Sequence, residues 1–207
     1  MHAFKLQVKI YAEHDAGVTA ETFIPIFHRW IKEHVLPELM IDVANYGHVP
    51  KGPGVALIGH GCDYFIDEAE GRFGLLHSRK RMAPEPGDRL ADAFRRALHA
   101  ASLLAVDPAV AGKLRFRTDE LLFRINDRLA APNSDATFAA ARPELEALAA
   151  RLYGGPFKLS RVGDARSLFA VKLVAGAGGA GGGRVAGDLA TLLERLGGPP
   201  GRDKSLA

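Results

Sequence analysis

The chain has 207 residues, of which 47% are hydrophobic and 25% charged, a composition typical of ordinary globular proteins. That composition excludes a mainly disordered chain, and no stretch approaches the roughly 18 consecutive apolar residues of a membrane-spanning helix. The net charge of +3 is too small to predict nucleic-acid binding, and the single cysteine, Cys62, excludes an internal disulfide. We therefore expect a soluble, cytoplasmic protein without membrane association.

The first elements follow from hydrophobic periodicity. Residues 4–12 alternate apolar and polar side chains, the period of a half-buried strand. From residue 19 to 35 aromatic and aliphatic residues recur at helical spacing, and Pro25 lies near the start of this helix, where its missing N–H costs least. Residues 40–46 predict a second strand.

The middle of the chain predicts strands around one helix. A continuous β run over 55–67 leads through a turn at 68–71 into a strand over 72–81, so that these segments form a hairpin. A helix follows over 88–105, with Asp88 as its cap. Residues 113–129 alternate in two bursts on either side of Thr118-Asp119-Glu120, which predicts a second hairpin.

The remaining segments predict a helix, two strands and a tail. The helix begins near Asn133, restarts at Pro143 and ends at Gly154, a residue favoured just after a helix end. The strands are expected over 157–162 and 168–174. A glycine-rich linker, 175–184, then leads to a short amphipathic helix, 185–196, which could dock on its own domain or on a protein partner.

These elements predict an α+β fold with a mixed, largely antiparallel sheet and about three helices on one face. The domain is expected to span 1–174, followed by a flexible tail over 185–207. Its order of elements is compatible with a βαββ pseudo-repeat, with halves 1–81 and 113–174 joined by the helix 88–105. The uncovered face and edges of such a sheet suit a homodimer.

A glycine-rich match to a dinucleotide-binding motif occurs at Gly176-Ala177-Gly178-Gly179-Ala180-Gly181. Binding of a dinucleotide also requires a returning parallel strand with an acidic residue about 20 residues further on. The residues after this match supply neither, and eight positions of Gly and Ala are typical of a linker. We therefore predict no nucleotide cofactor.

The first hairpin gathers the candidate catalytic residues His60, Cys62, Asp63 and His77. If Gly71 takes the left-handed position of a type I turn with a bulge, residue 63 pairs with 77 and an aspartate faces a histidine. If the loop has two or four residues, 62 pairs with 77 and 60 with 79. The thiol and two imidazoles then share a face, as in a zinc site formed by His60, Cys62 and His77 or an activated nucleophile.

We favour a purely structural interpretation of these residues, because a cysteine among aliphatic neighbours is often a buried small hydrophobe. Catalysis requires at least three of the four side chains to converge in an accessible pocket. Binding without catalysis tolerates their burial and predicts an exposed apolar or basic sheet face.

The loop over 47–54 is the second candidate site, because three glycines and two prolines in eight residues fix its shape. Its amides, with His48 and Lys51, could cradle an anion. We accordingly expect ligand contacts from four loop residues and from one residue of the adjacent hairpin: His48, Lys51, Gly52, Gly54 and Arg79. The sequence favours a non-enzymatic ligand- or protein-binding module, with a metal-binding protein or enzyme of the His/Cys/Asp hairpin as the alternative.

Overall fold

The structure is a computed structural model that describes residues 3, 5–49, 52–80, 88–176 and 187–201. Two short 3-10 helices cover Ala20–Thr22 and Ala69–Gly71. The α-helices are α1 (Phe23–Glu33), α2 (Arg89–Ala105), α3 (Asp135–Tyr153) and α4 (Leu189–Arg195). The strands are β1 (Leu6–His14), β2 (Met40–Asn45), β3 (Val55–Gly59), β4 (Cys62–Asp67), β5 (Gly74–Arg79), β6 (Leu114–Ile125), β7 (Phe157–Val162) and β8 (Phe169–Ala175).

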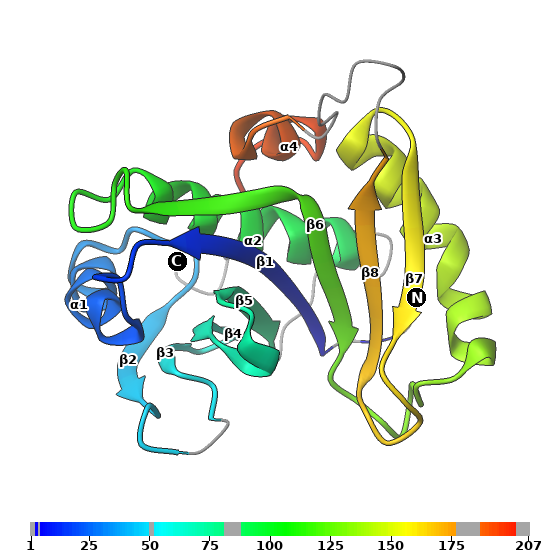
Figure 1. The fold of residues 1–207 in the computed structure, drawn as a ribbon, viewed down its shortest axis with the longest axis horizontal. Helices are drawn as coiled ribbons and strands as arrows, with labels where there is room; N and C mark the ends of the chain where they lie inside the picture. The colour runs from blue at the N-terminus through cyan, green and yellow to red at the C-terminus, as the bar shows by residue number, and fades with distance from the viewer. Residues whose placement is uncertain (1–2, 4, 50–51, 81–87, 177–186, 202–207) are drawn as a thin grey trace.

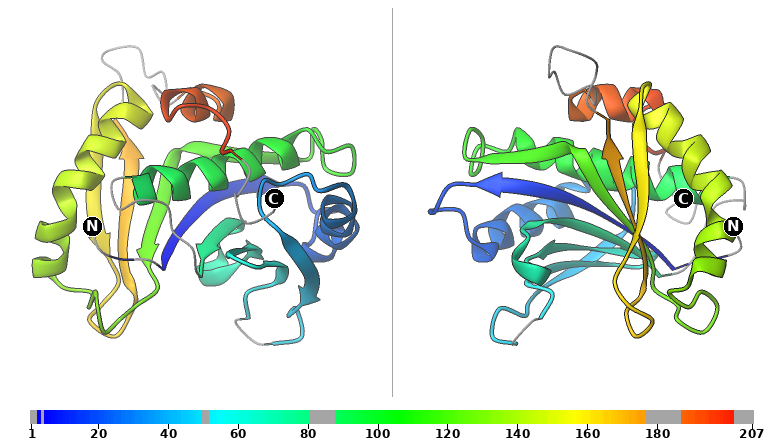
Figure 2. Two further views of the ribbon diagram at one scale, coloured as in Figure 1. Left: turned by 180° about the vertical axis from the view of Figure 1, so that it is seen from behind. Right: turned by 45° about the vertical axis from the view of Figure 1, so that its right-hand side comes forward.

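The strands form one eight-stranded antiparallel sheet in the order β2-β3-β4-β5-β1-β6-β8-β7 (Figure 1). One face packs with α1, α2 and α3 into a continuous hydrophobic core, and α2 crosses the centre of this face over β1, β5 and β6. Turning the molecule around brings α2 in front of the sheet (Figure 2). On the other face, here called the open face, the buried apolar cluster is small: Tyr11, Leu122 and Ala170. The predicted α+β class, with its helices on one face, is confirmed.

Local chemistry explains the helix ends. Ser134 caps α3 by accepting a hydrogen bond from the Thr137 N–H at 3.2 Å, and Gly154 ends it with a φ of 63°, a left-handed conformation that favours glycine. Pro143 lies within α3, and the helix continues through it. The predicted restart at this residue was therefore wrong, while the predicted end at Gly154 is confirmed.

The β run predicted over 55–67 is in fact two paired strands, β3 and β4, separated by a tight turn at His60 and Gly61. Gly59 makes the turn feasible, since a Cβ there would lie 2.2 Å from the Met40 Cε and 2.6 Å from the Cys62 carbonyl oxygen. Glycine at 59 and 61 was the available signal for a turn within an otherwise apolar run.

The hairpin predicted over 113–129 is also wrong, because β6 is one strand that bends. Its pairing with β1 slips between Ile10 and Ala12, so that residues 117–120 of β6 bulge opposite Tyr11 alone. Beyond this bulge β6 continues along β1 and pairs with β8 on its other side. The sheet changes direction along β6, which curves visibly in Figure 1.

The topology is compatible with the predicted βαββ pseudo-repeat. In each half a central strand, β1 or β6, is followed by a helix, then by an edge strand, β2 or β7, and then by the strand next to that edge. The first half additionally contains β4 and β5, which lie between β3 and β1. A duplication remains a prediction.

Helix α4 packs against α2 and α3, with Leu192, Leu193 and Leu196 buried. Arg195 strengthens this contact by donating to the Leu152 and Tyr153 carbonyl oxygens at 2.9 and 2.8 Å. These carbonyl groups lie at the C-terminal end of α3, where the helix dipole favours a positive charge. Most of the predicted linker, residues 177–184, lies outside the described residues. Among the described helices, none is both long and apolar enough to cross a membrane.

Candidate functional site

The register of the β4–β5 hairpin decides where the predicted residues lie. Tyr64 pairs with His77, Asp63 with Ser78 and Cys62 with Arg79, so neither predicted register occurs. The connection is longer than expected: Asp67 pairs with Gly74, and the 3-10 turn at 69–71 lies between them. The predicted pairing of Asp63 with His77 is thereby corrected.

Strand alternation separates the four candidate catalytic residues. Cys62 and His77 point towards the helices and are buried, at 1% and 0% exposure. Asp63 lies on the opposite face, where it pairs with Lys80 at 2.7 Å and accepts from the Gly59 N–H at 3.2 Å. His60 is exposed in the turn before β4. The structure thus keeps Cys62 and His77 together and brings neither His60 nor Asp63 to them.

Glu38 joins these two residues beneath α2. It comes from the connection between α1 and β2, and one ligand atom from each of Glu38, Cys62 and His77 lies within 4.8 Å of the other two. The Tyr64 hydroxyl donates to Glu38 Oε1 at 2.7 Å, and the Tyr64 ring lies 5.1 Å from the His77 ring. Three groups with oxygen, sulfur and nitrogen donors therefore converge in the core.

An ion-pair network surrounds this buried cluster. Arg96 of α2 bonds Glu38 Oε1 at 2.6 Å and Asp92 Oδ2 at 2.8 Å, and Arg79 donates to the same Asp92 oxygen. Burial lowers the pKa of His77 well below its ordinary value, and the positive charges of Arg79 and Arg96 lower it further. His77 is therefore a neutral imidazole at neutral pH.

The sequence could have revealed part of this network. Asp92 and Arg96 stand four residues apart on α2, interleaved with the apolar residues that pack on the sheet, a spacing that predicts a pair on one helix face. Glu38 offers no such signal, because it lies in an irregular connection and its partners come from β4 and α2.

Charged side chains also occupy the centre of the open face. Lys9 of β1 is 1% exposed and pairs with Asp67 of β4 at 2.7 Å, across β5. Gly74 of β5 stands between these strands, and a Cβ there would lie 2.4 Å from the Ile10 carbonyl oxygen of β1. Burial lowers the pKa of Lys9, although Asp67 acts in the opposite direction.

A second group on this face is organised around Glu120. Arg72 binds both of its carboxylate oxygens, at 2.7 and 3.0 Å, and Lys172 binds one of them at 3.0 Å. The Arg72 guanidinium also lies 3.5 Å from the centre of the Tyr11 ring, a cation–π contact. The hydrogen bonds from Arg72 outweigh burial and, with Lys172, lower the pKa of Glu120 to about 2.

Beside this group lies a hollow of about 480 Å³, here called the open-face pocket. Tyr11, Leu122 and Ala170 contribute apolar surface, and the turn between β7 and β8 forms one wall. Three cationic residues line it, Arg72, Arg124 and Lys172, against one acidic residue, Glu70. Within the described part of the chain the Arg124 side chain has neither a hydrogen bond nor an ion pair, whereas Arg72 and Lys172 share Glu120.

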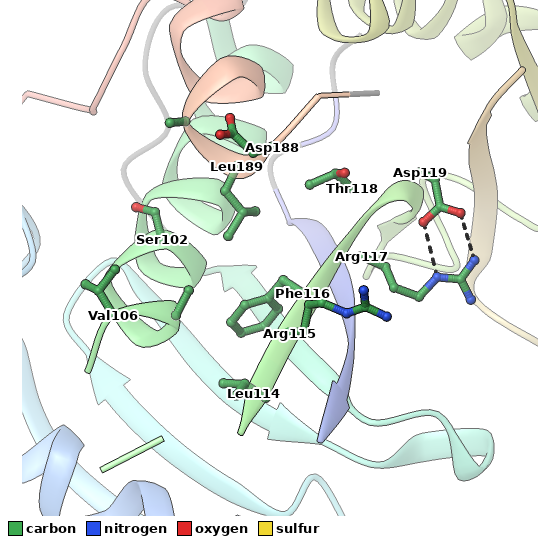
Figure 3. A pocket seen from close by; sticks show the side chains of 12 residues that line it. Ser102, Val106, Leu114, Arg115, Phe116, Arg117, Thr118, Asp119, Asp188 and Leu189 are labelled. Carbon is green, nitrogen blue, oxygen red and sulfur yellow. Dashed lines mark hydrogen bonds and ion pairs between the residues drawn. The ribbon is translucent and has the colours of Figure 1, made fainter. Parts of the chain in front are cut away.

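Another hollow, of about 500 Å³, lies between α2, the first half of β6 and α4 (Figure 3). Its surface is largely apolar, with Leu114, Phe116 and Leu189 around it. Polar side chains of this lining already bond within the chain. Arg117 donates to both carboxylate oxygens of Asp119, at 3.0 and 3.2 Å, as drawn in Figure 3. Thr118 donates to the Gly187 carbonyl oxygen. The other polar side chains of this lining, Ser102, Arg115 and Asp188, likewise have partners within the chain.

The loop predicted as an anion cradle borders a third hollow, of about 710 Å³, together with the hairpin residues 68–71. The Gly47, Val49 and Gly52 amides donate to nearby acceptors of the chain, namely Asn45 Oδ1 and the carbonyl oxygens of Tyr46 and Val49. The acids Glu68 and Glu70 line the hollow. His48 is exposed and Lys51 lies outside the described residues.

Two other predicted ligand residues have defined structural settings. Gly54 has a φ of +70°, and a Cβ there would lie 2.1 Å from the Ile66 carbonyl oxygen, so glycine allows β3 to begin beside β4. Arg79 is buried beneath α2, where it pairs with Asp92. Ligand binding by the loop stays a prediction.

Comparison of the chain with models of protein families, with curated proteins and with solved structures finds no match. The open-face pocket and the buried cluster are therefore the features from which a function can be inferred.

Proposed function

We propose that this chain is a non-enzymatic binding protein that holds a small anionic molecule in the open-face pocket. The observation that carries the proposal is Arg124, a half-buried cation on the pocket wall whose side chain makes no hydrogen bond or ion pair with the other described residues. A guanidinium in such a position is suited to a carboxylate or phosphate, which it binds through two parallel hydrogen bonds.

The neighbouring charges support an anion over a cation. Arg72 and Lys172 together carry two positive charges against the one of Glu120, so the pair leaves a positive excess beside Arg124. Glu70 is the single acid on the lining. The hypothesis of a binding protein without catalytic activity also predicts a basic surface on the uncovered face of the sheet.

The apolar surface indicates the rest of the ligand. Leu122 and Ala170 are buried in the open face beside Tyr11, whose ring is already covered on one side by Arg72. The volume of about 480 Å³ lies in the range of small-molecule sites. We infer an anion that carries a ring or a short apolar chain.

Replacing Arg124 with glutamine is expected to weaken binding of phenyl phosphate by about 10-fold or more, since a hydrogen bond to a charged group contributes about 1.5 to 3 kcal/mol. Isothermal titration calorimetry measures the affinity, with inorganic phosphate and phenol as the two halves of the probe. The wild-type protein should bind the whole probe more tightly than either half.

The matched control is Arg115→Gln, which changes an arginine on the same strand that is 74% exposed and pairs with Glu13. Its affinity should equal that of the wild type. Absence of phenyl phosphate binding by the wild type, or equal affinities of the Arg124 and Arg115 variants, would contradict the proposal.

A cytoplasmic location and a homodimer belong to the same proposal. The single cysteine is buried and forms no disulfide within the chain, which suits a reducing compartment. Edge strand β2 exposes Ile41 at 57%, and Leu39 just before it at 39%, in a sheet whose edge groups could pair with a second copy. We expect a dimer by light scattering that Ile41→Lys dissociates; a monomeric wild type would contradict it.

A further inference from the structure

We propose that Glu38, Cys62 and His77 form a buried zinc site, distinct from the open-face pocket on the other side of the sheet. One oxygen, one sulfur and one nitrogen of these residues lie within 4.8 Å of one another. The three side chains come from the connection after α1, from β4 and from β5. An ion bound to all of them would therefore tie three separate segments together.

The second observation is an unsatisfied histidine. His77 is 0% exposed, and among the described residues neither of its ring nitrogens has a hydrogen-bond partner. Glu38 Oε2 is likewise buried without one. A buried polar atom left without a partner destabilises the fold, and buried polar side chains in proteins nearly always have partners. Coordination to one ion would satisfy both residues at once.

The surroundings also orient the carboxylate as a ligand. Tyr64 and Arg96 both bond to Glu38 Oε1, at 2.7 and 2.6 Å, and thereby direct Oε2 elsewhere. Hydrogen bonds of this kind from neighbouring residues fix the position of metal ligands. Tyr64 pairs with His77 across the two strands, so one residue supports the carboxylate and packs against the imidazole.

The donor set selects the metal. A thiolate, an imidazole and a carboxylate together suit Zn²⁺, while Mg²⁺ and Ca²⁺ take oxygen ligands alone. Three protein ligands leave one tetrahedral position for a water molecule. On binding, the Cys62 thiol loses its proton to solvent, so that the cluster gains one positive charge overall. The carboxylates of Glu38 and Asp92 already balance Arg79 and Arg96, which limits the electrostatic cost to that single charge.

The test is a titration of the full chain with Co²⁺ as a spectroscopic substitute for Zn²⁺. We expect saturation at one ion per chain, with the charge-transfer absorption of a thiolate–cobalt bond. Zn²⁺ should displace the Co²⁺ and, in excess, raise the midpoint of thermal unfolding by about 5 to 10 °C.

Cys62→Ser, which nearly preserves side-chain volume, and His77→Gln should each abolish the charge-transfer absorption and the thermal shift. His60→Gln is the matched control on the same hairpin and should retain both, because His60 is exposed and outside the cluster. Absence of the absorption in the wild type at saturating Co²⁺, or its retention in Cys62→Ser, overturns the proposal. The wild-type measurement decides even if a variant does not fold.

Discussion

Replacing Asp92 with asparagine is expected to lower the free energy of unfolding by about 3 to 5 kcal/mol, the cost of removing one partner from a buried ion pair. Arg79 and Arg96 both direct a guanidinium nitrogen at Asp92 Oδ2, and all three side chains are at most 6% exposed. Asparagine keeps the shape of the side chain and removes its charge. Neither arginine can lose its proton to compensate, because a guanidinium stays charged in proteins.

Urea unfolding at pH 7 measures this effect. Asp88→Asn is the matched control, since Asp88 precedes the same helix, is exposed and makes no side-chain capping hydrogen bond. We expect the control to change the free energy of unfolding by less than about 0.5 kcal/mol. An equal loss in both variants would show that the buried network does not hold α2 on the sheet.

The second large effect is a loss of stability in acid that depends on Glu120. Hydrogen bonds from Arg72 and the charge of Lys172 lower the pKa of this carboxyl from its ordinary value of 4.5 to about 2 in the folded protein. A group whose pKa is lower in the folded state stabilises it above the unfolded pKa and loses that contribution as pH falls through the folded pKa. The shift corresponds to about 3 kcal/mol, present above pH 4.5 and lost towards pH 2.

Glu120→Gln should flatten the pH dependence of unfolding over that window and lower stability at pH 7 by about 2 to 3 kcal/mol. Urea unfolding at a series of pH values is the measurement. Glu146→Gln serves as the control, because Glu146 is 44% exposed and its pair with Arg142 is a surface i,i+4 contact. Identical acid profiles for the wild type and the Glu120 variant would contradict the assignment.

Periodicity predicted most of the fold, because each helix and most strands carry their own signal. The helix α3, with Ser134 and Gly154 at its ends, shows how local chemistry sets both boundaries. The bend of β6 could not be predicted in the same way. A polar interruption at 118–120 has the same appearance whether the chain reverses or merely bulges, and the pairing with β1 decides between them.

The candidate site depended on register and on residues distant in sequence. The hairpin turn contains two consecutive left-handed residues, Glu70 and Gly71. The prediction assumed a turn with Gly71 alone in this conformation, and the predicted pairing of β4 with β5 was therefore displaced from the observed one. Since side chains alternate along a strand, a small error in register changes every predicted neighbour. Arg124 shows the same limit, because only the assembled sheet places it beside a pocket rather than on a plain polar face.

The position of β1 has a consequence for folding. This strand precedes the other described strands in the chain, and both of its hydrogen-bonded neighbours, β5 and β6, come much later. A sheet whose central strand pairs with strands far away in the sequence has a high contact order, and such proteins fold slowly. Until residue 125 has been made, at least one edge of this hydrophobic strand stays unpaired, and the nascent chain is exposed to aggregation for that time.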